Sequence, residues 1–108
     1  MSERKYFVLS LKHLFPWKFG QPLCLWGHKR TADNEPRCFG GYNTKPSTSE
    51  LYTIEEFIEK YGKYNAVKKE PLKDFFVCTF KGLKKHYDDV LVEKETVENY
   101  YKMCDLEL

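Results

Sequence analysis

The sequence predicts an α+β fold, in which two or three helices pack on one face of a small, mostly antiparallel sheet. Three observations predict this class. Apolar and polar residues alternate early in the chain, a capped amphipathic helix begins near Thr53, and a short apolar segment precedes a second amphipathic stretch at the end. The 108 residues, 42% of them hydrophobic, suffice for one core and not for two, so we expect a single domain over residues 1–108.

Three strands are expected in the first part of the chain. Residues 5–14 alternate as a half-buried strand does, and residues 23–28 and 38–44 have the composition of a second and a third strand. The turn-forming pair Asp33-Asn34 lies between the last two, which predicts a hairpin with a long loop. Gly40 and Gly41 indicate either a bulge or a place where another group approaches the backbone closely.

The clearest helix follows a linker at residues 45–49. Thr53 and Glu56 form a capping-box pattern, in which the hydroxyl accepts from the third helical N–H and the carboxylate accepts from the cap N–H. Gly62 supplies the end of the helix. Between them runs an apolar stripe at positions i, i+3, i+4 and i+7, made of Ile54, Phe57, Ile58 and Tyr61.

The remaining elements alternate between strand and helix. Residues 71–87 fit a helix begun by Pro71, although residues 75–80 are also rich in strand-forming types; we favour the helix. A short strand at residues 90–92 follows the turn Asp88-Asp89. Thr96 is expected to cap a last helix, whose apolar stripe consists of Val97, Tyr100, Tyr101 and Cys104.

The composition predicts a cytoplasmic protein. No apolar run approaches the length of about 18 residues that a membrane span requires, and the start of the chain lacks the pattern of a signal peptide. The four widely spaced cysteines then favour reduced thiols over a disulfide framework.

Charge is distributed unevenly along the chain. Residues 1–45 carry eight basic and three acidic side chains, a balance of +5, whereas residues 46–108 carry ten and thirteen, a balance of −3. The basic part attracts anions, but the overall net charge of +2 falls short of what a dedicated duplex-DNA binder carries. Small anionic ligands or acidic proteins are therefore the better expectation.

No motif in the chain indicates a reaction. Cys24, His28 and Cys38 lack paired zinc-ligand spacing, and four residues along a strand separate Cys24 from His28 by roughly 13 Å. A nucleophile elbow, a C-x-x-C motif and a phosphate-binding loop are also absent from the sequence. We therefore expect a protein that is not an enzyme and that needs neither a metal nor a cofactor.

One group of residues suits ligand binding. Residues 17–45 hold both tryptophans, four of the six glycines and five of the eighteen Lys and Arg residues. If the three early strands are neighbours, cations for phosphate and rings for stacking gather at the end of the sheet. The alternative is that Trp26 and Tyr42 belong to the core and that the cations only solubilise the surface. The candidate ligand-binding residues are Ser10, Lys12, His13, Trp26, Lys29, Arg30, Arg37, Tyr42 and Asn43.

Three segments carry a resemblance to a known group of proteins. Residues 6–13 (YFVLSLKH), the triplet Leu25-Trp26-Gly27 and residues 40–44 (GGYNT) resemble small uncharacterised proteins carried by bacteriophages and prophages. The resemblance covers about the first half of the chain. It implies a protein in the host cytoplasm that opposes host defence, either by occluding a nuclease effector or by sequestering a nucleotide signal.

Two functions follow as expectations. The first is a non-catalytic binding protein of phage type that sequesters a nucleotide-like anionic ligand, with Lys12, Lys29, Arg30 and Arg37 on phosphate and Trp26 and Tyr42 stacking. The alternative is a protein–protein inhibitor or adaptor, acting for example on a host nuclease effector as anti-CRISPR proteins do. Its anchors would be Trp17, Phe19, Trp26 and Arg30, because aromatic residues and Arg dominate interface energetics. An exposed aromatic loop would also favour a homodimer.

Overall fold

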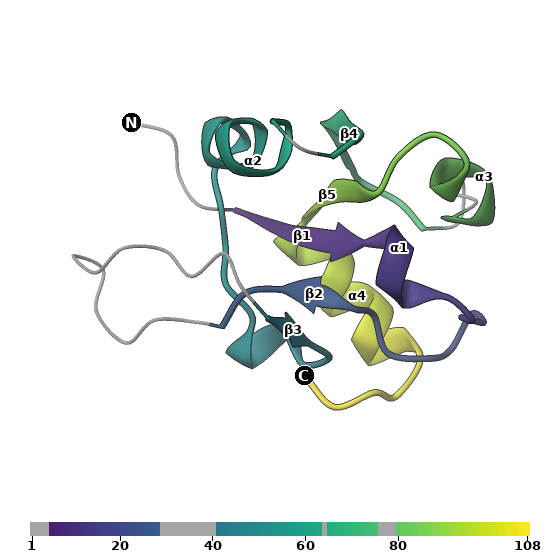
Figure 1. Cartoon of the computed structure of the whole chain (residues 1–108). Helices are drawn as coiled ribbons and strands as arrows, with labels where there is room; N and C mark the ends of the chain where they lie inside the picture. Colours follow the sequence, from purple (N-terminus) through teal and green to yellow (C-terminus); the bar gives the residue numbers. More distant parts are fainter. Residues whose placement is uncertain (1–4, 29–40, 64, 76–79) are drawn as a thin grey trace.

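The described part of the chain folds around one five-stranded mixed sheet with the strand order β3-β2-β1-β5-β4 (Figure 1). This arrangement comes from a computed structural model, which describes residues 5–28, 41–63, 65–75 and 80–108. The strands are β1 (Tyr6–Ser10), β2 (Leu25–Trp26), β3 (Tyr42–Asn43), β4 (Val67–Leu72) and β5 (Asp89–Glu93). The helices are α1 (Leu11–Leu14), α2 (Ile54–Tyr61), α3 (Phe80–Lys84), α4 (Lys94–Met103) and the 3-10 turn η1 (Pro46–Thr48).

Strand β1 lies at the centre of the sheet. It pairs antiparallel with β2 on one side and with β5 on the other, and β3 extends the sheet antiparallel beyond β2. The remaining strand, β4, pairs parallel with β5 at the opposite edge. Since three of the four pairings are antiparallel, the α+β class and the mostly antiparallel sheet are confirmed among the described residues.

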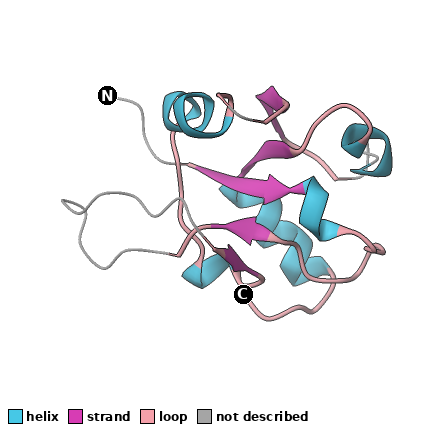
Figure 2. Ribbon diagram, viewed as in Figure 1, coloured by secondary structure: helices cyan, strands magenta, loops and turns pink. Residues whose placement is uncertain are grey.

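The two longer helices cover opposite faces of the sheet (Figure 2). Val8 and Leu91 point to one face and pack with Phe57 of α2, because alternate strand residues point to opposite sides. Leu9 and Val90 point to the other face, where they join the core of α4. Leu11 of α1 and Phe80 of α3 belong to the same core as α4, so three helices pack on that face, as the sequence predicts, and α2 covers the other face.

The expected helix at residues 53–62 is confirmed in detail. Glu56 N donates to Thr53 Oγ1 at 3.1 Å and Thr53 N donates to Glu56 Oε1 at 2.8 Å, so both halves of the capping box are formed. Gly62 is the C-cap residue. The strand at residues 90–92 and the buried stripe of α4 are likewise present.

The first three expected strands are shorter than the sequence suggests. Strand β1 stops at Ser10, because the Ser10 hydroxyl accepts from His13 N at 3.3 Å and caps α1, whose Leu11 and Leu14 are both buried. The second strand shrinks to β2, with His28 in a separate bridge to Ser49. The third is β3 alone, since residues 38–40 lie outside the described part; β2 and β3 nevertheless pair as a hairpin does.

Two expectations in the second half are wrong. Pro71 does not begin a helix but lies in β4, an edge strand, where the missing N–H of proline removes no ladder bond from the interior of the sheet. Helix α3 begins only at Phe80, and residues 76–79 are outside the described part. Thr96 does not cap the last helix either: α4 starts at Lys94 after Glu93, and Thr96 Oγ1 donates to the Lys73 carbonyl at 2.8 Å.

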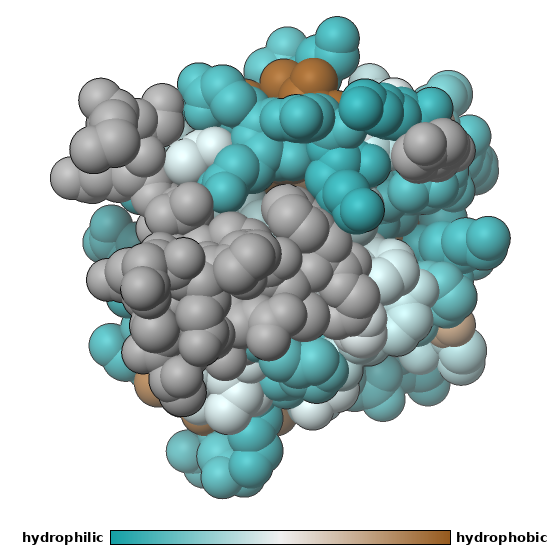
Figure 3. Space-filling model, turned by 60° about the vertical axis from the view of Figure 1, so that its left-hand side comes forward, coloured by the Kyte–Doolittle hydropathy of each residue, from teal (hydrophilic) through white to brown (hydrophobic). Residues whose placement is uncertain are grey.

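The outer surface is mainly polar. On the face shown in Figure 3, hydrophilic residues surround small, separate hydrophobic patches among the atoms that are drawn in colour. In the part of the chain that the structure describes, no helix combines the length and the apolar character needed to cross a membrane.

Candidate functional site

Three rings from three elements form an aromatic platform, made of His13, Trp26 and Tyr42. Trp26 and Tyr42 are direct partners in the β2–β3 pairing, so their side chains project from the same face of the sheet. Their ring centroids are 4.0 Å apart, and the His13 ring lies 4.4 Å from that of Tyr42. Tyr42 remains 39% exposed, so the platform is fixed from within and open to solvent.

Ser10 holds the platform together at the end of β1. Its hydroxyl caps α1 through His13 N, which places the His13 ring one helical turn after the strand. Burial raises the pKa of Tyr42, and the Ser10 side chain acts against this in the lowering direction. Ser10 itself is fully buried, so its contribution is to position His13 and Tyr42, and it is not available to a ligand.

A buried carboxylate lies beneath the platform. Trp26 Nε1 donates to Asp89 Oδ1 at 2.8 Å, and Asp89 is only 2% exposed. In the β1–β5 register Asp89 is opposite Ser10, which brings the two polar side chains to one end of the sheet. A buried polar group requires a hydrogen-bond partner, and here the indole N–H and the carboxylate satisfy one another.

Neighbouring groups shift the pKa of Asp89 in opposite directions. Burial raises the pKa of Asp89 above its ordinary value, the Trp26 hydrogen bond lowers it, and the neighbouring Asp88 charge raises it further. The positive charges of His13 and Lys12 act in the lowering direction. The platform thus has the Asp89 carboxyl group inside and the Lys12 ammonium group outside.

The Cys24 thiol lies close enough to this carboxylate to be affected by its charge. Burial, followed by the charge of Asp89, raises the pKa of the Cys24 thiol above its ordinary value. Since the thiolate is the reactive form, this environment holds Cys24 in the unreactive state at neutral pH. Cys24 and Cys104 are both free thiols, while Cys38 and Cys78 lie outside the described residues.

The sequence-predicted residues divide into three groups. Ser10, His13, Trp26 and Tyr42 come together, and Lys12 is exposed beside them on α1. Lys29, Arg30 and Arg37 lie outside the described residues, so the structure does not place them. Asn43 does not join the site. Its Nδ2 donates to the Thr48 carbonyl at 3.0 Å and its Oδ1 accepts from Lys45 N at 3.0 Å, so its side chain stabilises the segment that follows β3.

At Gly41 another group approaches the backbone closely, which is one of the two alternatives that the Gly40-Gly41 pair left open. The φ of Gly41 is +80°, and a Cβ at this position would lie 2.7 Å from Nε2 of His28. The group that approaches the backbone here is therefore the His28 ring. His28 follows β2, where it forms a bridge with Ser49, and it is exposed.

The anchors of the alternative function do not form one surface. Trp17 and Phe19 pack against Tyr100 of α4, with centroid distances of 6.2 and 5.3 Å. Trp26 belongs to the other face, where it packs with the core under α2. A partner that contacts Trp17 and Phe19 therefore meets a different face of the sheet from one that contacts Trp26, and Arg30 lies outside the described residues.

Comparison with known proteins adds no identity to this geometry: no protein-family model, no curated protein and no solved structure matches the chain. Within the described ranges, no group of three or more His, Cys, Asp or Glu side chains is placed to hold a metal ion. Asp89 is the member of the site that the sequence did not predict.

Proposed function

We propose that this chain is a non-catalytic binding protein that sequesters a planar, anionic, nucleotide-like ligand on the outer face of Tyr42. One observation carries the proposal: Tyr42 is held on its inner side by Trp26 and His13 and is still 39% exposed. An aromatic side chain fixed in this way offers a base a flat surface without having to be ordered on binding. Stacking of a base on such a ring contributes about 1–3 kcal/mol.

Positive side chains around the platform favour a ligand that carries phosphate. Lys12 supplies an exposed positive charge on α1, next in sequence to His13, which is one of the rings. Lys29 follows Trp26 by three residues in the sequence, and three residues of extended chain span at most about 11 Å. Arg30 and Arg37 belong to the same basic segment between β2 and β3. Phosphate oxygens suit these cations, because hydrogen bonds between charged groups are the stronger kind.

Asp89 limits the orientation of the ligand. A carboxylate beneath Trp26 repels a phosphate that approaches through the centre of the platform. The base therefore belongs on Tyr42, and the phosphate belongs at the rim near Lys12. This arrangement separates the stacking half of the ligand from its charged half, and a mononucleotide, a cyclic dinucleotide or a related signal provides both halves.

The missing catalytic motif in the sequence agrees with sequestration rather than turnover. A protein that removes a nucleotide signal needs affinity and slow release, and it needs no reaction. The raised pKa of the Cys24 thiol agrees with this role, because it leaves this thiol in its unreactive form.

Isothermal titration of the purified protein with cyclic and linear nucleotides tests the proposal. We expect micromolar or tighter binding, and recovery of the ligand unchanged in mass afterwards. Tyr42→Ala should weaken binding by about tenfold or more, while Tyr42→Phe keeps the stacking surface and should retain most of the affinity. Arg30→Glu should also weaken binding, with an unchanged melting temperature. If no nucleotide binds the wild type at micromolar concentration, sequestration is excluded and the inhibitor function takes its place.

A further inference from the structure

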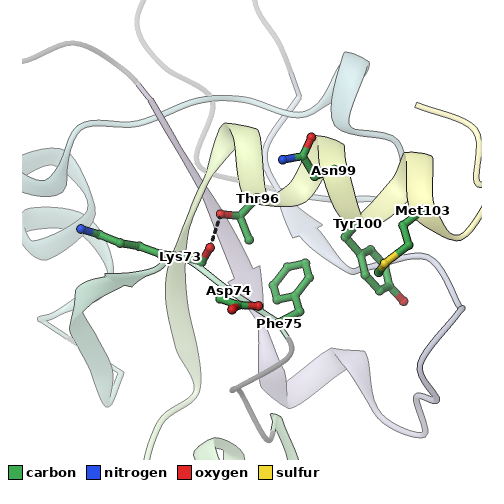
Figure 4. Close-up of a pocket in the computed structure, with 7 residues that line it drawn as sticks. All are labelled: Lys73, Asp74, Phe75, Thr96, Asn99, Tyr100 and Met103. Carbon is green, nitrogen blue, oxygen red and sulfur yellow. Dashed lines mark hydrogen bonds between the residues drawn. The ribbon is translucent and has the colours of Figure 1, made fainter.

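A second surface, on the α4 side of the sheet, has the properties of an interface. Its centre is a pocket of about 250 Å³ with an apolar floor of Phe75, Tyr100 and Met103 (Figure 4). The rim is polar and consists of Lys73, Asp74, Thr96 and Asn99. Figure 4 shows Tyr100 and Met103 projecting from α4 toward the same space as Phe75, which comes from the segment after β4.

A protruding ring lies beside this pocket. Phe19 is 56% exposed and Met103 is 50% exposed, the two highest values among the large hydrophobic side chains that the structure describes. Phe19 packs edge-on against Tyr100 at 5.3 Å between centroids, and Tyr100 also lines the pocket. The protrusion and the pocket therefore share one residue and lie next to each other.

The protrusion is built into the loop after α1. Gly20, directly after Phe19, has φ +104°, a conformation that other residues rarely adopt, and its N–H donates to the Tyr100 hydroxyl at 3.0 Å. The same hydroxyl donates to the Gln21 carbonyl at 2.7 Å. These two hydrogen bonds tie the loop to α4, so Phe19 is held in position while its outer side faces solvent.

We propose that this surface binds a second copy of the chain, with Phe19 of each copy seated in the Phe75–Tyr100–Met103 pocket of the other. A two-fold interface brings the same patch of both molecules together, so the patch must complement itself. A protruding apolar ring next to an apolar pocket meets this requirement, because the ring of each copy can enter the pocket of the other.

The homodimer is independent of nucleotide binding. The platform lies on the face of the sheet covered by α2, whereas Phe19 and the pocket lie on the α4 side. A dimer formed through α4 therefore leaves both copies of Tyr42 accessible.

Sedimentation velocity over a range of protein concentrations tests the proposal. The wild type is expected to shift from monomer to dimer as concentration rises into the micromolar range. Phe19→Ala removes the protrusion, and Asn99→Arg places a long charged side chain at the pocket rim; each should raise the dissociation constant by about tenfold or more. Tyr42→Ala, on the other face, is the control and should dimerise as the wild type does. Thermal melts establish that every variant is folded.

A mixing experiment separates this interface from other modes of association. Phe19→Ala keeps an intact pocket and Asn99→Arg keeps an intact protrusion, so a mixture of the two forms one complete contact that neither forms alone. We expect the mixture to associate more strongly than either variant by itself. A wild type that remains monomeric at all concentrations, or a dimer that both substitutions leave intact, overturns the proposal. So does a monomer that pairs only with a different protein.

Discussion

The indole N–H of Trp26 donates to the Asp89 carboxylate at 2.8 Å, and this bond links β2 to β5 across the intervening strand β1. It ties the inner ring of the platform to the most buried part of the sheet. The Tyr42 ring packs against Trp26 at an angle of 41°, so the exposed ring depends on Asp89 through one intermediate residue. Asp89 is therefore a positioning residue for the proposed site.

Replacing Asp89 with Ala is expected to lower the free energy of unfolding by about 1–3 kcal/mol, because it leaves the Trp26 N–H without its acceptor. Asp89→Asn keeps an acceptor oxygen in the same place and should cost less. Denaturant unfolding of both variants measures the difference. Equal stability of the wild type and Asp89→Ala would mean that the bond does not contribute.

Asp89 should also make stability depend on pH in an unusual direction. Burial raises its pKa above the ordinary value of 3.8, so the folded state takes up the proton more readily than the unfolded state. Stability from this group is then fully present below 3.8 and decreases as the pH rises through the raised pKa. We expect the wild type to gain stability relative to Asp89→Asn as the pH falls from about 7 to about 4. A stability difference that stays constant over this range would contradict the raised pKa.

Tyr101 is expected to stabilise the fold through its hydroxyl. This group accepts from Leu23 N at 2.8 Å and donates to the Thr44 carbonyl at 2.6 Å, which joins α4 to the chain on both sides of the β2–β3 pair. Burial raises the pKa of Tyr101 to about 12. Tyr101→Phe should therefore lower the free energy of unfolding by about 1–3 kcal/mol near neutral pH.

The matched control for Tyr101 is Tyr87→Phe, at a half-buried position whose hydroxyl makes no hydrogen bond to another described residue. It should change stability by no more than about 0.5 kcal/mol. Spectrophotometric titration gives a second check: burial raises the pKa values of both Tyr100 and Tyr101 to about 12, so Tyr101→Phe should remove part of the ionisation seen near pH 12.

Loss of the capping box is expected to lower stability without changing ligand binding. Thr53→Ala removes the acceptor for Glu56 N and should lower the free energy of unfolding by about 1 kcal/mol, whereas Thr53→Ser keeps the hydroxyl and should be close to neutral. Chemical denaturation and nucleotide titration of the same samples would show whether only stability changes. A loss of binding in Thr53→Ala would mean that α2 contributes to the site.

The sequence predicts an element correctly where its capping residues and its apolar pattern indicate the same structure. Thr53, Glu56 and Gly62 mark both ends of α2, and an apolar stripe lies between them. The segment after Ser10 shows why other elements were missed. Alternation over residues 5–14 suits a strand, but Leu11 and Leu14 are also three residues apart, and the serine cap favours the helix. Pro71 is ambiguous in the same way, since proline suits both the first turn of a helix and an edge strand.

The sequence predicts only part of the site, because one of its residues is positioned by a strand pairing between distant segments. Strand order brings Ser10, Trp26 and Tyr42 together, and the sequence could indicate this through the hairpin pattern. Asp89 was assigned to a turn with Asp88, because acidic pairs usually lie in turns. One signal was available, since Asp89 directly precedes the apolar residues 90–92. Alternation along the strand places Asp89 on the same face as Leu91, and Trp26 lies on that face too. Only the pairing of β5 with β1, far apart in sequence, decides that this position is buried.

The fluorescence of Trp26 tests the central claim most directly. The chain has two tryptophans, so Trp17→Phe leaves Trp26 as the single indole emitter, directly beneath Tyr42. Titration of this variant with cyclic and linear nucleotides should give a saturable change in emission at micromolar ligand for at least one of them, and Tyr42→Ala in the same background should abolish it. Emission that stays constant up to millimolar concentration of every nucleotide would contradict a stacking site on Tyr42.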